Sequence, residues 1–157
     1  HTVALQAAQA VADRVGDAAP VEIVDLSALA PHLLAATPSA SVELSLDLVR
    51  GADVLVVASP TYKGTYTGLL KSFLDRVPTG ALASTVALPL LVMGDARHAL
   101  AVEVHLRPLL VELGAHVPTP GIALIESQLP DAVTLLAEWA DRVAPQMAGI
   151  LNERLPS

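Results

Sequence analysis

The sequence predicts a doubly wound α/β domain, and three observations support this prediction. Short apolar runs that read as buried strands alternate along the chain with segments of helical periodicity. Two of these runs, 52–58 and 86–93, are almost continuously apolar, as is typical of parallel strands covered by helices on both faces. The 157 residues are 53% hydrophobic and only 16% charged, which indicates a single domain over residues 1–157 with a large core or large interfaces.

The first half of the chain contains two expected helices and two expected strands. We expect a helix over 2–15, a strand over 21–25, a connection over 26–40, a helix over 41–50 and a strand over 52–58. The first helix has an apolar stripe through Val3, Ala7 and Val11, and Gly16 is a typical stop. The connection is rich in Pro, Ser and Ala, and Gly51 ends the second helix.

The second half continues the alternation. We expect a loop over 59–66, a helix over 68–77, a strand over 86–93, a helix over 99–114, a strand over 115–124 and a helix over 131–151. Pro78 stops the first of these helices. Pro108 lies inside the second, where a proline usually kinks or locally adjusts the backbone.

This order begins with a helix, so no strand precedes the first helix. In a doubly wound sheet of order 2-1-3-4-5, the first strand lies inside the sheet rather than at its edge. The loop after that strand leads into the first helix and is the usual position for binding phosphate. We therefore expect residues before His1 to carry the first strand and its phosphate loop.

Composition argues against several classes of protein. The chain has no cysteine, which excludes disulfides, thiolate metal sites and cysteine nucleophiles. Its 9 Lys and Arg against 16 Asp and Glu give a net charge of −7, so we expect no nucleic-acid partner. No apolar stretch reaches the ~20 residues that span a bilayer. With no signal-peptide pattern either, we expect no membrane span and a cytoplasmic location.

The densest polar and aromatic cluster follows the 52–58 strand. Residues 59–68, Ser-Pro-Thr-Tyr-Lys-Gly-Thr-Tyr-Thr-Gly, hold both tyrosines of a chain that is only 3% aromatic. One interpretation is a ligand loop, in which a planar ring lies against the segment and backbone N–H groups reach its polar edge. The other is a strand-to-helix turn whose Pro and Gly serve backbone geometry and whose tyrosines cover the helix.

A second loop, Gly-Asp-Ala-Arg-His over 94–98, connects the 86–93 strand to the next helix. Gly94 lets a ligand approach the backbone, and Asp95 is a good N-cap whose side chain could serve the helix alone. His98 either bonds a ligand carbonyl or lies near the first helical turn. On the pattern alone we favour the structural interpretation of this loop.

Other catalytic and cofactor motifs do not occur. The histidines lack metal-ligand spacing, so we expect no metal site. Ser59 is not in a G-x-S-x-G elbow, and neither a G-x-G-x-x-G fingerprint nor a Walker-type loop is found.

Two segments resemble the NADPH-dependent FMN reductases, most closely the branch that serves alkanesulfonate monooxygenases. Residues 58–78 resemble the family pattern of a strand followed by (S/T)-P-x-Y-x-x-x-(Y/F)-(S/T)-G-x-L-K-x-x-L-D. Residues 94–110 resemble G-x-x-x-H-x-L-A-x-(D/E)-x-x-L-(K/R)-P, although Asp95 stands where Thr or Ser is more usual. The resemblance extends from the first helix to Glu126, and residues 127–130 form a shorter connection than the family generally has.

The resemblance implies a flavodoxin-like fold and reduction of FMN by NADPH or NADH. By position it implies that Pro60, Thr61, Tyr62 and Lys63 contact FMN, and that Gly94, Asp95 and His98 approach its ring system. Hydride transfer needs no acid or base from the protein, so we expect binding residues and no catalytic residue. Arg97 and Lys63 are candidates for attracting the 2′-phosphate of NADPH, although Arg97 equally fits a surface role without a ligand.

The resemblance also implies partners. The family's long fourth helix, here 99–114, often forms a dimer or tetramer interface, and an inserted residue can produce a π-bulge there, near Val104 and His105. Reduced FMN is expected to serve a flavin-dependent monooxygenase, reached by diffusion or in a transient complex. Two alternatives remain open: a reductase that retains FMN and reduces a quinone, azo dye or metal oxyanion, and a flavodoxin-like electron carrier that does not turn over NAD(P)H.

Overall fold

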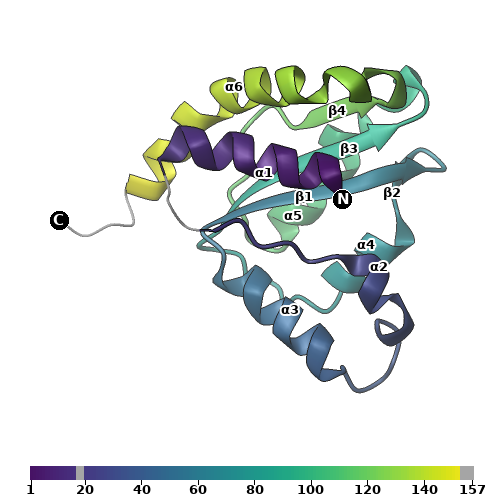
Figure 1. Cartoon of the computed structure of the whole chain (residues 1–157). Helices are drawn as coiled ribbons and strands as arrows, with labels where there is room; N and C mark the ends of the chain where they lie inside the picture. Colours follow the sequence, from purple (N-terminus) through teal and green to yellow (C-terminus); the bar gives the residue numbers. More distant parts are fainter. Residues whose placement is uncertain (17–19, 153–157) are drawn as a thin grey trace.

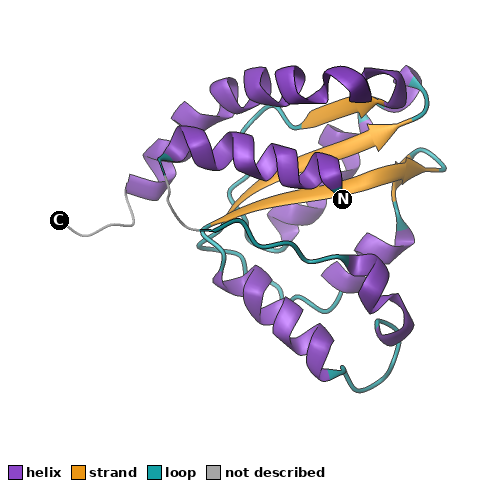
Figure 2. Cartoon of the chain, in the orientation of Figure 1, coloured by secondary structure: helices purple, strands orange, loops and turns teal. Residues whose placement is uncertain are grey.

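The computed structural model describes residues 1–16 and 20–152, and in these residues four strands form one sheet (Figures 1 and 2). The sheet order is β2-β1-β3-β4. The strands are β1 (Val54–Tyr62), β2 (Thr65–Tyr66), β3 (Val86–Met93) and β4 (Ile122–Ile125). β3 pairs in parallel with β1 and β4, whereas β2 is antiparallel to β1.

Helices cover both faces of this sheet, as the sequence predicts. α1 (Thr2–Val15) and α6 (Ala132–Asn152) lie side by side on one face (Figure 1). The opposite layer contains α2 (Leu26–Leu29), α3 (Ala40–Gly51), α4 (Gly68–Leu74) and α5 (Arg107–Glu112). A chain with parallel strands between two helical layers has the expected doubly wound architecture.

The central strand β3 shows how the sequence produces two cores. Successive side chains of a strand point to opposite faces. Accordingly, Leu88 and Leu90 pack against α1 and α6, whereas Ala87 and Leu91 pack against the opposite helices. All residues of β3 except Val92 are buried, which explains its nearly continuous apolar sequence.

The segment 21–25 differs from its prediction as a strand. Residues 21–24 lie outside any helix or strand and make no backbone hydrogen bond to another described residue. Asp25 instead caps α2, where its side chain accepts a hydrogen bond from the Ser27 N–H at 2.9 Å. Val-Glu-Ile-Val has strand composition, but no described strand lies alongside to pair with it.

The expected loop over 59–66 also differs, because most of it is a β-hairpin. β1 continues to Tyr62, and two residues connect it to β2. Lys63 and Gly64 both have left-handed backbones, with φ of 55° and 86°. Two consecutive positive φ values are typical of the two-residue type I′ turn that closes tight hairpins.

The expected helix over 99–114 is divided into two kinds of helix. Val102–Leu106 is π-helical, and α5 follows with Pro108 near its start. The predicted irregularity at Val104 and His105 is therefore confirmed. A proline lacks the N–H that the interior of an α-helix needs, and Pro108 lies in the first turn of α5, directly after the π turn, where a proline is tolerated. α4 ends at Leu74, three residues before the predicted end.

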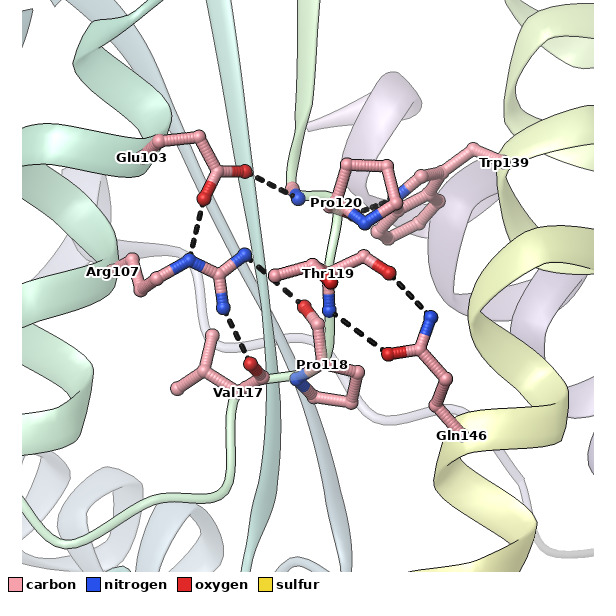
Figure 3. Close-up of polar contacts among 9 residues, drawn as sticks. Glu103, Arg107, Val117, Pro118, Thr119, Pro120, Trp139 and Gln146 are labelled. Carbon is pink, nitrogen blue, oxygen red and sulfur yellow. Dashed lines mark hydrogen bonds and ion pairs between the residues drawn. The ribbon is translucent and has the colours of Figure 1, made fainter.

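The expected last strand is reduced to β4, and a polar network fixes the segment before it (Figure 3). The Glu103 carboxylate accepts a hydrogen bond from the Gly121 N–H at 2.7 Å and pairs with Arg107. Arg107 donates to the carbonyls of Val117 and Pro118. From α6, Trp139 donates to the Pro120 carbonyl at 2.7 Å. These contacts hold the proline-rich approach to β4 between two helices.

Candidate functional site

The two candidate loops meet at the carboxyl ends of β1 and β3. These strands are parallel neighbours in which Pro60 lies opposite Val92. The loops that follow the two strands therefore leave the sheet at the same edge. A β-carbon added to Gly64 would lie 3.9 Å from Cδ2 of His98. The hairpin turn and the 94–98 loop are therefore in contact, as expected for ligand-binding loops in an open α/β sheet.

A buried serine fixes the base of the hairpin. The Ser59 side chain accepts a hydrogen bond from the Thr67 N–H at 3.0 Å, and its hydroxyl lies 2.8 Å from the Pro60 carbonyl. Thr67 in turn caps α4 by accepting from the Leu70 N–H at 3.3 Å. The sequence around Ser59 shows only that this serine is not in a nucleophile elbow, and it gives no sign of this structural role. A threonine at the start of a helical pattern indicates the cap of α4, but it does not indicate the hydrogen bond from the Thr67 N–H to Ser59.

Thr61 carries an unsatisfied polar atom at this edge. Its Oγ1 is buried and has no hydrogen-bond partner among the described residues. A buried polar atom without a partner is unfavourable and unusual in folded proteins. The adjacent Tyr62 is 67% exposed, which leaves an aromatic ring available at the surface. Pro60 and Lys63 are exposed beside them.

The 94–98 loop is built around an internal ion pair. Asp95 accepts from the Arg97 N–H at 2.9 Å and from its guanidinium at 2.6 Å. These hydrogen bonds to Arg97 lower the pKa of Asp95 below its usual value. Asp95 therefore caps a short 3-10 turn, Ala96–His98, which agrees with the structural interpretation. Gly94 is exposed, and nothing lies within 4 Å of the position of an added β-carbon.

A large hollow in the molecule lies away from these loops. It measures about 1250 Å³ and is bounded by α1, residues 20–24, α3 and the first part of β1. None of the seven predicted binding residues lines it. The candidate site is thus a surface edge formed by two loops.

Within the described residues, no His, Cys, Asp and Glu side chains form a group of three suited to a metal ion. None of the described helices is both long and apolar enough to cross a bilayer.

Comparison with known proteins identifies the family. Residues 1–129 match the family model described as NADPH-dependent FMN reductase. The chain belongs to the NADPH-dependent FMN reductase family. An FMN reductase (NADPH) of Pseudomonas putida is 35% identical over 130 residues, which cover 70% of this chain and 66% of the relative. The chain spans between about half and two thirds of the length of the curated relatives it matches.

Solved structures show the same fold for this member of the FMN reductase family. An oxidoreductase from Corynebacterium diphtheriae has a TM-score of 0.86 and 29% identity, over 98% of this chain and 89% of its own. The apo form of an NADH:FMN oxidoreductase has a TM-score of 0.70 and 33% identity, over 93% of this chain and 82% of its own. The architecture is flavodoxin-like, as the resemblance implies.

The side chains at the two loops suit FMN. A polar atom of a bound flavin would satisfy the unpaired Thr61 hydroxyl, and the exposed Tyr62 ring offers an apolar face to a planar ring system. The open backbone at Gly94 allows close approach of a ligand. Asp95 is already engaged by Arg97, which leaves it less capacity for ligand contacts than the resemblance implies.

Proposed function

We propose that this chain binds FMN at the edge formed by the hairpin turn and the 94–98 loop, and that it catalyses FMN reduction by NADPH or NADH. The observation that supports this most directly is the buried, unpaired Thr61 hydroxyl at the carboxyl end of β1, the strand that leads into the hairpin turn. Membership of the FMN reductase family supports the same assignment.

Each loop residue has a binding or orienting task in this proposal. Thr61 donates to or accepts from a polar atom of the flavin, and the Tyr62 ring packs against an apolar surface of the ligand. Lys63 supplies positive charge for phosphate groups. His98 lies against Gly64 and fixes the position of the turn relative to the second loop. No side chain of the protein has to exchange a proton during the reaction.

FMN, when bound, would supply the electron acceptor: a hydride from the reduced nicotinamide and a proton from water would give oxidised nicotinamide and reduced FMN. The protein accelerates this transfer by holding the two ring systems together in one orientation. We further propose that the reduced flavin leaves the enzyme and serves a separate flavin-dependent monooxygenase of the alkanesulfonate type. This part rests on the resemblance of residues 58–78 and 94–110.

The test is NADPH oxidation by the protein as free FMN is titrated, with the flavin content of the purified protein recorded first. The expected result is nearly colourless protein and a rate that saturates with added FMN. A yellow protein whose rate ignores added FMN would support a reductase that retains its flavin for a quinone, azo dye or metal oxyanion. FMN binding without NAD(P)H oxidation would support an electron carrier.

We also propose self-association, as a dimer or tetramer, through the 99–114 segment. Three apolar side chains on this segment are largely exposed: Leu100 at 65%, Val104 at 49% and Val111 at 55%. Burial of such a face is what obligate interfaces provide. A Val104→Lys variant is expected to reduce the molar mass measured by light scattering. A matched Val133→Lys variant on α6, where the valine is 63% exposed, should leave the mass unchanged.

A further inference from the structure

Residues 116–125 form the outer edge of the sheet, beside β3. Among the described residues β4 ends the strand order, so one side of it has no strand neighbour. An unpaired strand edge presents a row of N–H and C=O groups and is a template for pairing with another chain. This edge is therefore a surface on which a second copy of the chain could extend the sheet.

Side chains from both helical layers occupy the first part of this edge (Figure 3). From α5, Arg107 donates to the carbonyls of Val117 and Pro118. From α6, the Gln146 carboxamide accepts from the Thr119 N–H at 3.2 Å and donates to the Thr119 carbonyl. The two prolines of this segment have no N–H, so its backbone offers few groups to another strand.

Two further side chains occupy the edge of β4 itself. Successive residues of a strand direct their N–H and C=O groups to alternate sides, so Gly121, Ala123 and Ile125 face one side. The Glu103 carboxylate accepts from the Gly121 N–H at 2.7 Å. The Gln128 side chain accepts from the Ile125 N–H at 2.9 Å. Because these two N–H groups bond to side chains rather than to β3, that side is the outer one, and the two caps lie on either side of Ala123.

The edge is also out of step with β3. His116 bridges to Val86, and Ile122 pairs with Leu90. The chain therefore advances six residues along the edge while β3 advances only four. The extra residues make the edge bulge away from a regular strand path, and bulges and prolines are two means by which natural sheets prevent pairing at their edges.

Several of these hydrogen bonds are not needed to satisfy buried groups. Thr119, Pro120 and Gln146 are exposed, so water would satisfy the same backbone groups if the side chains were absent. Exchanging a hydrogen bond to water for one within the protein contributes little net stability. The side chains instead impose a competition, because a strand from another chain has to displace them before it can pair with the edge.

We propose that Glu103, Gln128 and Gln146 close the outer edge of the sheet to strand addition by a second copy of the chain. Each of these side chains occupies a backbone group that an added strand would need. Self-association is then left to other surfaces, and the sheet does not extend from one copy into the next. The proposal concerns this edge and does not depend on FMN binding.

A double variant that opens the edge of β4 tests the proposal. Glu103→Leu with Gln128→Leu removes the acceptors at Gly121 and Ile125. Light scattering measures association, and amide hydrogen exchange at equal protein concentration locates the contact. Relative to the unaltered protein, we expect a raised molar mass and an Ala123 amide that exchanges about tenfold more slowly or better.

Three controls isolate the edge. Glu103→Gln with Gln128→Glu keeps an acceptor at both positions and should leave the mass and the exchange unchanged. Val143→Ala removes buried apolar volume from α6, so it should lower stability without slowing exchange at Ala123. Gln128→Leu alone leaves the pair of Glu103 and Arg107 intact and should give a smaller effect of the same kind, even if the double variant fails to fold. The proposal is overturned if no folded leucine variant associates through β4, or if the acceptor-keeping variant associates equally.

Discussion

Replacing Thr61 by valine is expected to change FMN affinity and the stability of the ligand-free protein in opposite directions. Valine retains the branched shape and the strand preference of threonine but removes the hydroxyl. In the ligand-free protein this hydroxyl is buried and unpaired. Removing it therefore removes an unfavourable group rather than a hydrogen bond.

The two magnitudes follow from the same atom. A buried polar group without a partner costs about 1–3 kcal/mol, so Thr61→Val should leave the ligand-free free energy of unfolding unchanged or raise it by about 1 kcal/mol. One neutral hydrogen bond to the flavin contributes about 0.5–1.5 kcal/mol. Its loss should raise the Kd for FMN by roughly 2- to 12-fold.

Flavin fluorescence titration gives the Kd, and urea denaturation gives the free energy of unfolding. Thr65→Val is the matched control, because Thr65 lies on β2 of the same hairpin and pairs with Tyr62. Thr65→Val should not show this combination of a raised Kd for FMN and an unchanged or raised free energy of unfolding. An unchanged Kd together with a loss of stability in Thr61→Val would refute the reasoning, since the hydroxyl would then serve the fold and not the flavin.

Three further changes test other parts of the structure. Glu103→Gln keeps an acceptor for the Gly121 N–H but loses the charge that pairs with Arg107, so a loss of about 1 kcal/mol in urea denaturation is expected at pH 7. The pairing lowers the pKa of Glu103 in the folded state, so its contribution is present above the ordinary value of 4.5 and disappears as pH falls through the folded pKa. The difference from the unaltered protein should therefore shrink in acid, and a difference independent of pH would contradict the pairing. Gly121→Ala places a β-carbon 2.9 Å from two side chains, so it should lower the Tm and reduce the free energy of unfolding by about 1–3 kcal/mol. An unchanged Tm would show that these two side chains move aside at little energetic cost. Lys63→Ala should lower the NADPH to NADH ratio of kcat/KM by about 2- to 5-fold, whereas Arg97→Ala, whose charge is already balanced by its carboxylate neighbour, should leave the ratio nearly unchanged.

Elements whose causes are local were predictable from the sequence. Gly16 ends α1 with φ of 73°, the left-handed conformation that glycine adopts most easily. The unbroken apolar run of β3 matches its burial by both helical layers. Pro108 and the neighbouring motif indicated an irregular helix, and the π-helical turn lies at Val102–Leu106. The two candidate loops meet because each follows one of two neighbouring parallel strands, and such strands end at one edge of the sheet.

Other features depend on neighbours that the sequence pattern does not reveal. Residues 21–24 have strand composition, but a strand exists only where another strand offers hydrogen bonds. The hairpin after β1 has no strong signal in the sequence, because Lys-Gly is a less usual pair for a type I′ turn than Asn-Gly. The orphaned hydroxyl of Thr61 and the Ser59–Thr67 contact are properties of three-dimensional packing. No spacing in the sequence predicts them.

The left-handed turn at Lys63 and Gly64 affects the thermodynamics of association. A two-residue turn with both φ values positive has few alternative conformations, and Ser59 anchors its base to the start of α4. The surface at the hairpin turn therefore has its binding conformation before a ligand arrives, and the protein loses little conformational entropy when the ligand binds. A ligand at this edge should thus associate with a rigid surface, with a rate set mainly by diffusion and orientation rather than by a slow closing movement.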